Sequence, residues 1–160
     1  MEDYENQEEI AMITGVVHSG IAVKSLDVSI PFYRDVLGLK PREREEVRRS
    51  RGDKLAVPGA VIQTCVIEIP GSEATIELIE YKEPASMFNY GCPVNTPGQV
   101  HIAFRVDDIE AEIERLKKYN VAFCSDSYET IKDGPIAGWK WIYFKDPDGT
   151  NFELIEETQL

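Results

Sequence analysis

The stretch His18-Ser-Gly-Ile-Ala-Val-Lys-Ser-Leu26 is followed 83 residues later by a similar one, His101-Ile-Ala-Phe-Arg-Val-Asp-Asp-Ile109. The chain has two histidines, and each opens one of these stretches. A second repeated element, the tetrapeptide Glu-Leu-Ile-Glu, closes each unit at residues 77–80 and 153–156. Because self-similarity at a fixed offset indicates a repeated structural unit, the sequence predicts two like halves.

Both halves show the same order of predicted elements. Residues 16–23 and 100–106 are rich in β-branched and apolar residues, which is typical of strands, and apolar residues at helical spacing follow each of them. Asp27 and Asp108 stand where helix N-caps are expected. Further strands are expected after Leu39, at 61–69 and 75–81 in the first half, and at 121–124, 140–145 and 151–156 in the second. The sequence therefore predicts an α+β fold, in which paired βαβββ modules form a curled mixed β-sheet with the helices outside.

The predicted boundaries divide the chain into four parts within one domain. Five acids lie in the first nine residues, which is typical of a solvated tail. Seven basic residues lie between Lys40 and Lys54, a pattern that favours an exposed loop or edge strand over a site for an anionic group. The parts are an acidic tail at 1–12, a first module at 13–85, a connection at 86–98 and a second module at 99–160.

Composition excludes several classes of partner. Among the 160 residues, 17 are basic and 29 are acidic, and the net charge of −12 argues against binding nucleic acid through phosphate contacts. No apolar run approaches the roughly 20 residues of a membrane helix, and the acidic N-terminus lacks the apolar core of a secretory signal. The three cysteines have no CxxC spacing. We therefore expect a cytoplasmic protein without a thiolate zinc site, a nucleic-acid partner or a membrane partner.

Strand parity places the candidate metal ligands. Side chains alternate across a strand, so each histidine shares a face with small residues, while the bulky apolar residues face the helices. The same alternation places the first glutamate of each tetrapeptide on one face of its strand. A curled sheet would bring the two histidines and these two glutamates together on its concave side. Two imidazoles and two carboxylates suit Zn²⁺, Ni²⁺, Co²⁺, Mn²⁺ or Fe²⁺, and a six-coordinate ion keeps two positions for water or substrate. The predicted metal ligands are His18, Glu77, His101 and Glu153.

The same face carries the candidate substrate contacts. Arg105 shares it with His101 and could bind an anionic substrate group, although an exposed ion pair is the alternative. Trp139, Trp141 and Tyr143 share one face of a predicted strand. We expect these aromatic side chains to line the pocket, with plain core packing as the alternative.

At these residues the sequence resembles the vicinal oxygen chelate superfamily, which groups glyoxalase I, methylmalonyl-CoA epimerase, extradiol dioxygenases, and fosfomycin- and bleomycin-resistance proteins. The resemblance runs from His18 to Glu156. It implies the same four ligands, one divalent ion with zinc as the first choice, and a homodimer. It rests on the segments HSGIAVKSLDVSIPFYRDVLGLK, TIELIEY, GQVHIAFRVDDIEAEIERL and YFKDPDGTNFELIE.

The resemblance implies an enzyme of the epimerase or glyoxalase branch. The preferred hypothesis is an isomerase or epimerase that removes a proton α to a carbonyl and forms an enolate. Its substrate would be a keto-cyclitol, an acyl-CoA or a related oxygenated compound. Glu77 and Glu153 would act as base and acid. The sequence leaves open which glutamate is the base, and whether the metal site forms within one chain or across a dimer.

The sequence is compatible with three alternative functions. A glyoxalase I-type lactoylglutathione lyase uses two histidines and two glutamates, but Ala22 stands where the bacterial enzymes carry an arginine. An extradiol-type dioxygenase would use two histidines and Glu153, yet residues 134–136 read Gly-Pro-Ile where its signature carries a histidine. A non-catalytic drug-binding resistance protein would suit the acidic composition.

Overall fold

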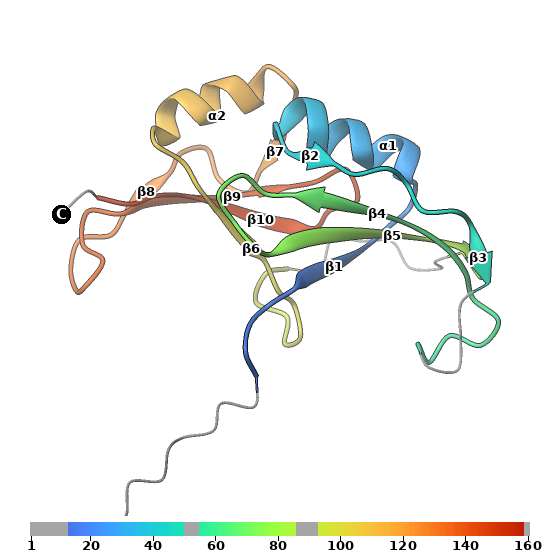
Figure 1. Cartoon of the computed structure of the whole chain (residues 1–160). Helices are drawn as coiled ribbons and strands as arrows, with labels where there is room; N and C mark the ends of the chain where they lie inside the picture. Colours follow the sequence, from blue (N-terminus) through green and yellow to red (C-terminus); the bar gives the residue numbers. More distant parts are fainter. Residues whose placement is uncertain (1–12, 50–54, 86–92, 159–160) are drawn as a thin grey trace, which may run out of the picture.

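The computed structural model describes residues 13–49, 55–85 and 93–158. Two β-sheets lie side by side, and the helices cover the same side of both (Figure 1). The predicted tail at 1–12 and part of the predicted connection at 86–98 lie outside the described residues.

The first module contains a mixed sheet in the order β1-β5-β4-β2, with β3 also paired to β4. Strand β1 runs parallel to β5, and the other pairs are antiparallel. The elements are β1 (His18–Val23), α1 (Leu26–Pro31), the π-helical turn η1 (Phe32–Val36), β2 (Lys40–Pro41), β3 (Arg48–Arg49), β4 (Val61–Glu68) and β5 (Thr75–Glu83).

The second module repeats this topology in the order β6-β10-β9-β7, with β8 paired to β9. Strand β6 is parallel to β10, as β1 is to β5. The elements are β6 (Ile102–Arg105), α2 (Ile109–Lys117), β7 (Ala122–Phe123), β8 (Glu129–Thr130), β9 (Lys140–Lys145) and β10 (Asn151–Glu156).

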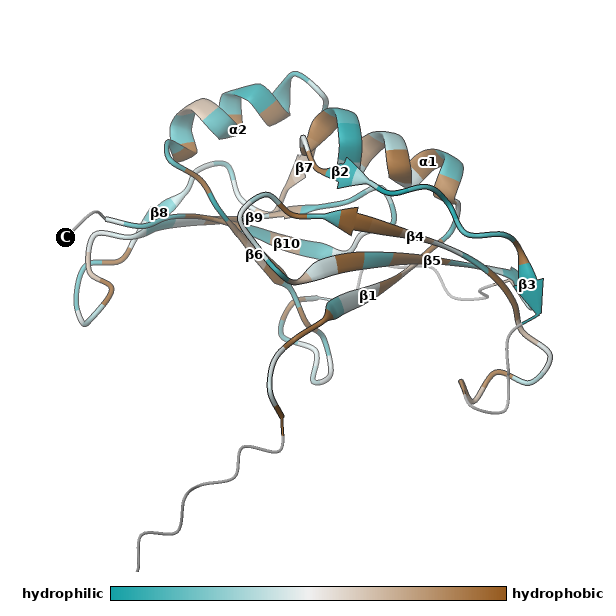
Figure 2. Ribbon diagram, in the orientation of Figure 1, coloured by the Kyte–Doolittle hydropathy of each residue, from teal (hydrophilic) through white to brown (hydrophobic). Residues whose placement is uncertain are grey.

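The predicted α+β class, the two repeated modules and the outer helices are confirmed. Among the described residues, strands pair within each module, so the curled surface is made of two five-stranded mixed sheets that do not close into a barrel. The short strands β3 and β8 give no sequence signal of their own, because two residues are too few for an alternating pattern. Helix α2 presents hydrophilic residues to solvent (Figure 2) and buries Ile109, Ile113 and Leu116.

The second glutamate of each repeated tetrapeptide binds the N-terminus of a helix. Glu80 on β5 accepts a hydrogen bond from the Leu26 backbone N–H at 2.9 Å, and Glu156 on β10 accepts one from Ile109 N–H at 2.8 Å. A carboxylate there satisfies a free donor and favours the positive end of the helix dipole. The second glutamate of Glu-Leu-Ile-Glu therefore anchors a helix.

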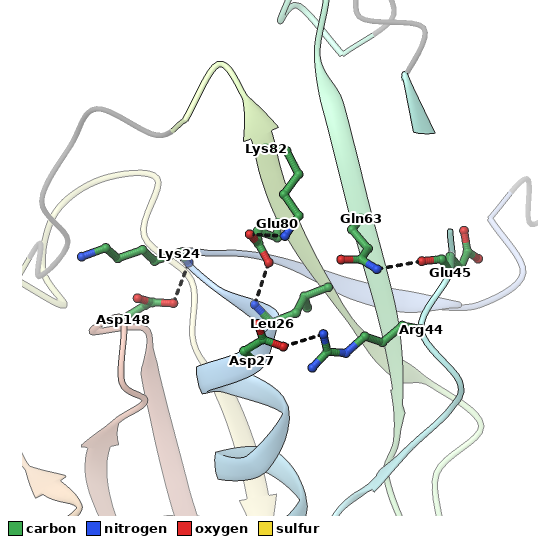
Figure 3. A network of polar contacts seen from close by, with 9 residues as sticks. All are labelled: Lys24, Leu26, Asp27, Arg44, Glu45, Gln63, Glu80, Lys82 and Asp148. Carbon is green, nitrogen blue, oxygen red and sulfur yellow. Dashed lines mark hydrogen bonds and ion pairs between the residues drawn. The ribbon is translucent and has the colours of Figure 1, made fainter. Parts of the chain in front are cut away.

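The predicted N-cap of the first helix is wrong. Ser25 occupies that position, and its side chain makes no capping hydrogen bond. Asp27 lies in the first turn and pairs with Arg44 at 2.7 Å (Figure 3). Glu80, which lies on β5 and far from the helix in sequence, binds the free backbone N–H instead. Local sequence rules for N-caps do not detect a contact of this kind. The predicted cap Asp108 is confirmed, since its carboxylate accepts from Ala111 N–H at 2.9 Å.

A buried tyrosine joins the two modules. Tyr33 lies in η1 with none of its surface exposed, and its hydroxyl donates to Asp146 Oδ2 of the β9–β10 turn at 2.9 Å. Burial raises the pKa of both groups, and the raised pKa of Tyr33 keeps its side chain a neutral phenol that can donate to Asp146. The Tyr33 ring packs edge-on against Phe152 of β10 at 5.9 Å. In the same turn, Asp148 accepts from the Lys24 backbone N–H at 2.8 Å (Figure 3). These contacts fix how the modules dock.

The basic segment is held by ion pairs with acids. The described arginines at 42, 44, 48 and 49 lie beside Glu68, Asp27, Glu45 and Glu83 respectively. This supports the expected exposed loop and edge strand. Residues 51 and 54 of the segment lie outside the described residues. In the described part of the chain, no helix has the length and apolarity needed to cross a membrane.

The hydrogen bond between Tyr33 and Asp146 predicts that removing the Tyr33 hydroxyl lowers the stability of the protein. Tyr33→Phe removes a buried donor and leaves the Asp146 carboxylate with fewer partners. We expect the free energy of unfolding in urea to fall by about 1–3 kcal/mol. Tyr119→Phe, at a half-exposed ring, is the control and should change it by less than about 0.5 kcal/mol. Equal stability of the two variants would contradict the role of this contact.

Glu156 predicts a pH dependence. Its hydrogen bond from Ile109 N–H and the ammonium of Lys140 lower its pKa in the folded protein. A carboxyl whose pKa is lowered by folding stabilises the fold above its unfolded pKa of about 4.3, and loses this effect as the pH falls through the folded value. Glu156→Gln should therefore cost about 1 kcal/mol at pH 7 and little at pH 3, measured by urea unfolding. The control Glu114→Gln, on the exposed side of α2, should show no such pH-dependent loss.

Candidate metal centre

The first histidine–glutamate pair is set by the parallel register of β1 and β5. Gly20 lies opposite Glu77, so His18, two residues earlier on the same face, is its diagonal neighbour. His18 Nε2 lies 3.4 Å from Glu77 Oε2. The side chains are 47% and 25% exposed, so an ion in solution has access to both.

The second pair repeats this geometry. Ala103 lies opposite Glu153 in the parallel register of β6 and β10, and His101 precedes it by two residues. His101 Nε2 lies 3.1 Å from Glu153 Oε2, with the side chains 42% and 12% exposed. The predicted equivalence of the two units thus extends to the side chains that carry the candidate chemistry.

Tyr143 adds a third polar group to the second pair. It lies opposite Glu153 in the antiparallel register of β10 and β9, and its hydroxyl oxygen is 3.2 Å from His101 Nε2. Its ring meets His101 edge-on at 5.0 Å and Trp141 edge-on at 5.7 Å. Partial burial and the nearby carboxylate of Glu153 raise the pKa of Tyr143. It is therefore a neutral hydroxyl at neutral pH.

The other predicted substrate contacts lie farther along this face. Arg105 pairs with Glu157 at 3.0 Å and its side chain is 71% exposed, so the ion-pair alternative describes its contact in the structure. Arg105 and Gly138 border a cavity of about 460 Å³, whereas the half-buried Trp139 is not among the residues that line it. Trp141 lies one step from Tyr143 on the same face and packs against it.

The four predicted ligands form two pairs. No group of three or more His, Cys, Asp or Glu side chains lies close enough to hold one ion within the described ranges, which include all four ligands. The donor types nevertheless fit a divalent ion. Each pair presents an accessible imidazole nitrogen and a carboxylate about 3 Å apart, and borderline ions such as Zn²⁺ accept this mixed nitrogen and oxygen set. Each module therefore carries one histidine–glutamate pair of the four predicted ligands.

Sequence reasoning missed two functional details. It gave no role to the second glutamate of the tetrapeptide, although a spacing of three along a strand places Glu77 and Glu80 on opposite faces. It also missed the contact of Tyr143 with His101, which depends on the register between β9 and β10.

Comparison with known proteins assigns the family. The model of the Glyoxalase/Bleomycin resistance protein/Dioxygenase superfamily matches residues 15–154. The chain therefore belongs to this superfamily, as its motifs predict.

Two curated relatives are about equally similar to the chain. The 2-epi-5-epi-valiolone epimerase of an Actinomyces species is 32% identical over 145 residues, covering 88% of this chain and 78% of that protein. A lactoylglutathione lyase of Haemophilus influenzae is 32% identical over 146 residues, covering 88% of this chain and 91% of that protein. Enzymes of two reaction types thus lie at the same distance in sequence.

A solved structure agrees on the fold. A glyoxalase family protein from Bacillus cereus superposes with a TM-score of 0.75 at 22% identity, covering 96% of this chain and 99% of that chain. At that identity the match supports the architecture and carries no information about the reaction.

Proposed function

We propose that this protein is a divalent-metal-dependent isomerase or epimerase that moves a proton α to a carbonyl. The observation that carries the proposal is the equivalence of the two histidine–glutamate pairs, with nitrogen–oxygen distances of 3.4 and 3.1 Å. The proposed ligands are His18, Glu77, His101 and Glu153, with zinc as the first candidate ion. The substrate class is a small molecule with adjacent oxygens, and the cysteine usage favours a cytoplasmic setting.

We further propose that the site is completed across a homodimer. Tyr33 and the β9–β10 turn hold the modules of one chain in a docking that leaves the two pairs apart. Strands β1 and β6 are at the edges of their sheets, so their outer backbone groups have no partner strand among the described residues. Val17 and Val100, each directly before a ligand histidine, are 77% and 78% exposed. A second copy would cover these apolar residues and place His101 and Glu153 of the partner subunit opposite the first pair.

The chain's own residues supply the acid–base chemistry. A divalent ion between the pairs would act as a Lewis acid and stabilise the negative charge that develops on a carbonyl oxygen. One carboxylate accepts the proton from the adjacent carbon, and the proton then returns to the same or the opposite face. Glu77 and Glu153 are the candidates, because they come from different modules. The histidines orient the site, and Trp141 with Tyr143 covers one side of it.

The relatives support two candidate reactions. The similarity to an epimerase supports the preferred one. The equal identity to a lactoylglutathione lyase supports a glyoxalase I-type lyase as the second candidate, which would also begin by removing a proton from carbon. Ala22 stands where the resemblance places the arginine that helps bind glutathione, so the epimerase is favoured.

Metal content tests the proposal. Purified wild-type protein should contain about one equivalent of zinc per chain by mass spectrometry, and His101→Ala should contain little, because it loses a ligand of every site. The control Tyr128→Phe, whose hydroxyl binds Glu110 outside the site, should keep its zinc. Deuterium exchange should then be screened with α-hydroxyketones, hemithioacetals and acyl-CoA thioesters. Wild-type protein without metal after zinc loading would overturn the proposal.

Mixing two inactive variants tests the shared site. His18→Ala and His101→Ala homodimers each lack one ligand in both sites. After subunit exchange, a heterodimer regains one intact site, from the wild-type pairs of the two chains, so a 1:1 mixture should bind about a quarter of the wild-type zinc. If both pairs of one site belonged to one chain, mixing would restore none. Sedimentation should give a dimer for each variant, which excludes failure to associate.

A further inference from the structure

The two half-sites have equivalent ligands but different surroundings. In the second module, the residue opposite Glu153 is Tyr143, whose hydroxyl lies 3.2 Å from His101 Nε2. In the first module, the residue opposite Glu77 is Val66, which has no polar group. His101 Nε2 therefore faces a carboxylate and a hydroxyl, whereas His18 Nε2 faces a carboxylate 3.4 Å away.

The second pair is also held more firmly. The Tyr143 ring packs edge-on against His101 on one side and Trp141 on the other, with centroid distances of 5.0 and 5.7 Å. Such packing restricts rotation of the imidazole and lowers the entropy that metal binding has to remove. Groups that orient a ligand histidine contribute to metal affinity although they do not touch the ion.

Glu77 has more freedom than Glu153. Its side chain is 25% exposed, against 12% for Glu153. Its cross-strand neighbours are Gly20, which has no side chain, and Val66, which offers no hydrogen bond. Glu153 instead lies between Ala103 and Tyr143. The Glu77 carboxylate can therefore move away from a shared ion with less loss of contact.

We propose that the half-sites are unequal: the second-module pair, oriented by Tyr143, anchors the ion, and Glu77 is the carboxylate that moves protons. This inference rests on the proposed metal centre and assigns different roles to its two glutamates. Tyr143 is a positioning residue that acts through His101. Glu77 accepts the proton as the electron pair of the carbon–hydrogen bond becomes part of the enolate, and the epimer forms when that electron pair makes a new bond to the proton on the opposite face of the same carbon.

Measurements of zinc affinity test whether Glu153 contributes more to metal binding than Glu77 does. Competition with a chromogenic chelator would compare Glu77→Gln, Glu153→Gln and the control Glu114→Gln, which replaces an acid of α2 paired with Lys117. We expect Glu153→Gln to weaken zinc binding at least tenfold more than Glu77→Gln, and Glu114→Gln to have no effect. Equal losses in the two site variants, or a larger loss in Glu77→Gln, would overturn the inference.

Tyr143→Phe keeps the ring and removes the hydroxyl, with Tyr128→Phe as the matched control. Tyr143→Phe should weaken zinc binding about tenfold and change the visible spectrum of the cobalt-loaded protein, because the orientation of His101 changes. A purely structural role would lower stability and leave the cobalt spectrum unaltered, which would overturn the inference.

If wild-type protein binds no zinc, the proposed function fails. If it binds zinc but the variants differ from the expected order of zinc affinity, only the unequal roles of the two pairs fail.

Discussion

Parallel pairing between the first and last strands of each module is the constraint on which the candidate site depends. In the first module the register places Gly20 opposite Glu77, and the alternation of side chains then brings His18 to the same face. The glutamate three residues later has to face the other way, where it binds the N-terminus of the helix. A single strand pairing thus fixes both a candidate metal ligand and the start of a helix, and the second module repeats this arrangement.

The docking of the modules decides what each pair can become. Tyr33 and Asp146 form a buried hydrogen bond between modules, and the aromatic core around Phe152 is continuous across them. In this docking the two histidine–glutamate pairs of one chain lie apart. The same geometry supports the proposed dimer, because the two histidine–glutamate pairs, two edge strands and two exposed valines occupy equivalent positions of the repeat.

Symmetry in the ligands does not extend to their neighbours. Tyr143 and Val66 occupy equivalent places opposite the two glutamates, yet only the tyrosine can hydrogen-bond. A reaction that takes a proton from carbon and returns it needs groups that keep the ion in place and a carboxylate that is free to transfer the proton. In the proposed reaction, the unequal neighbours of the two glutamates would provide that difference.

The sequence alone determined the repeat, the α+β class, the strands β9 and β10 and the N-cap Asp108, because these depend on local pattern, alternation and turn residues. It also selected the four candidate ligands, since parity is a local property. Only the tertiary structure showed that Glu80 replaces Asp27 at the start of α1, that Tyr143 meets His101, and that the ligands form two pairs. These features depend on register and docking between residues far apart in the chain, which no local pattern encodes.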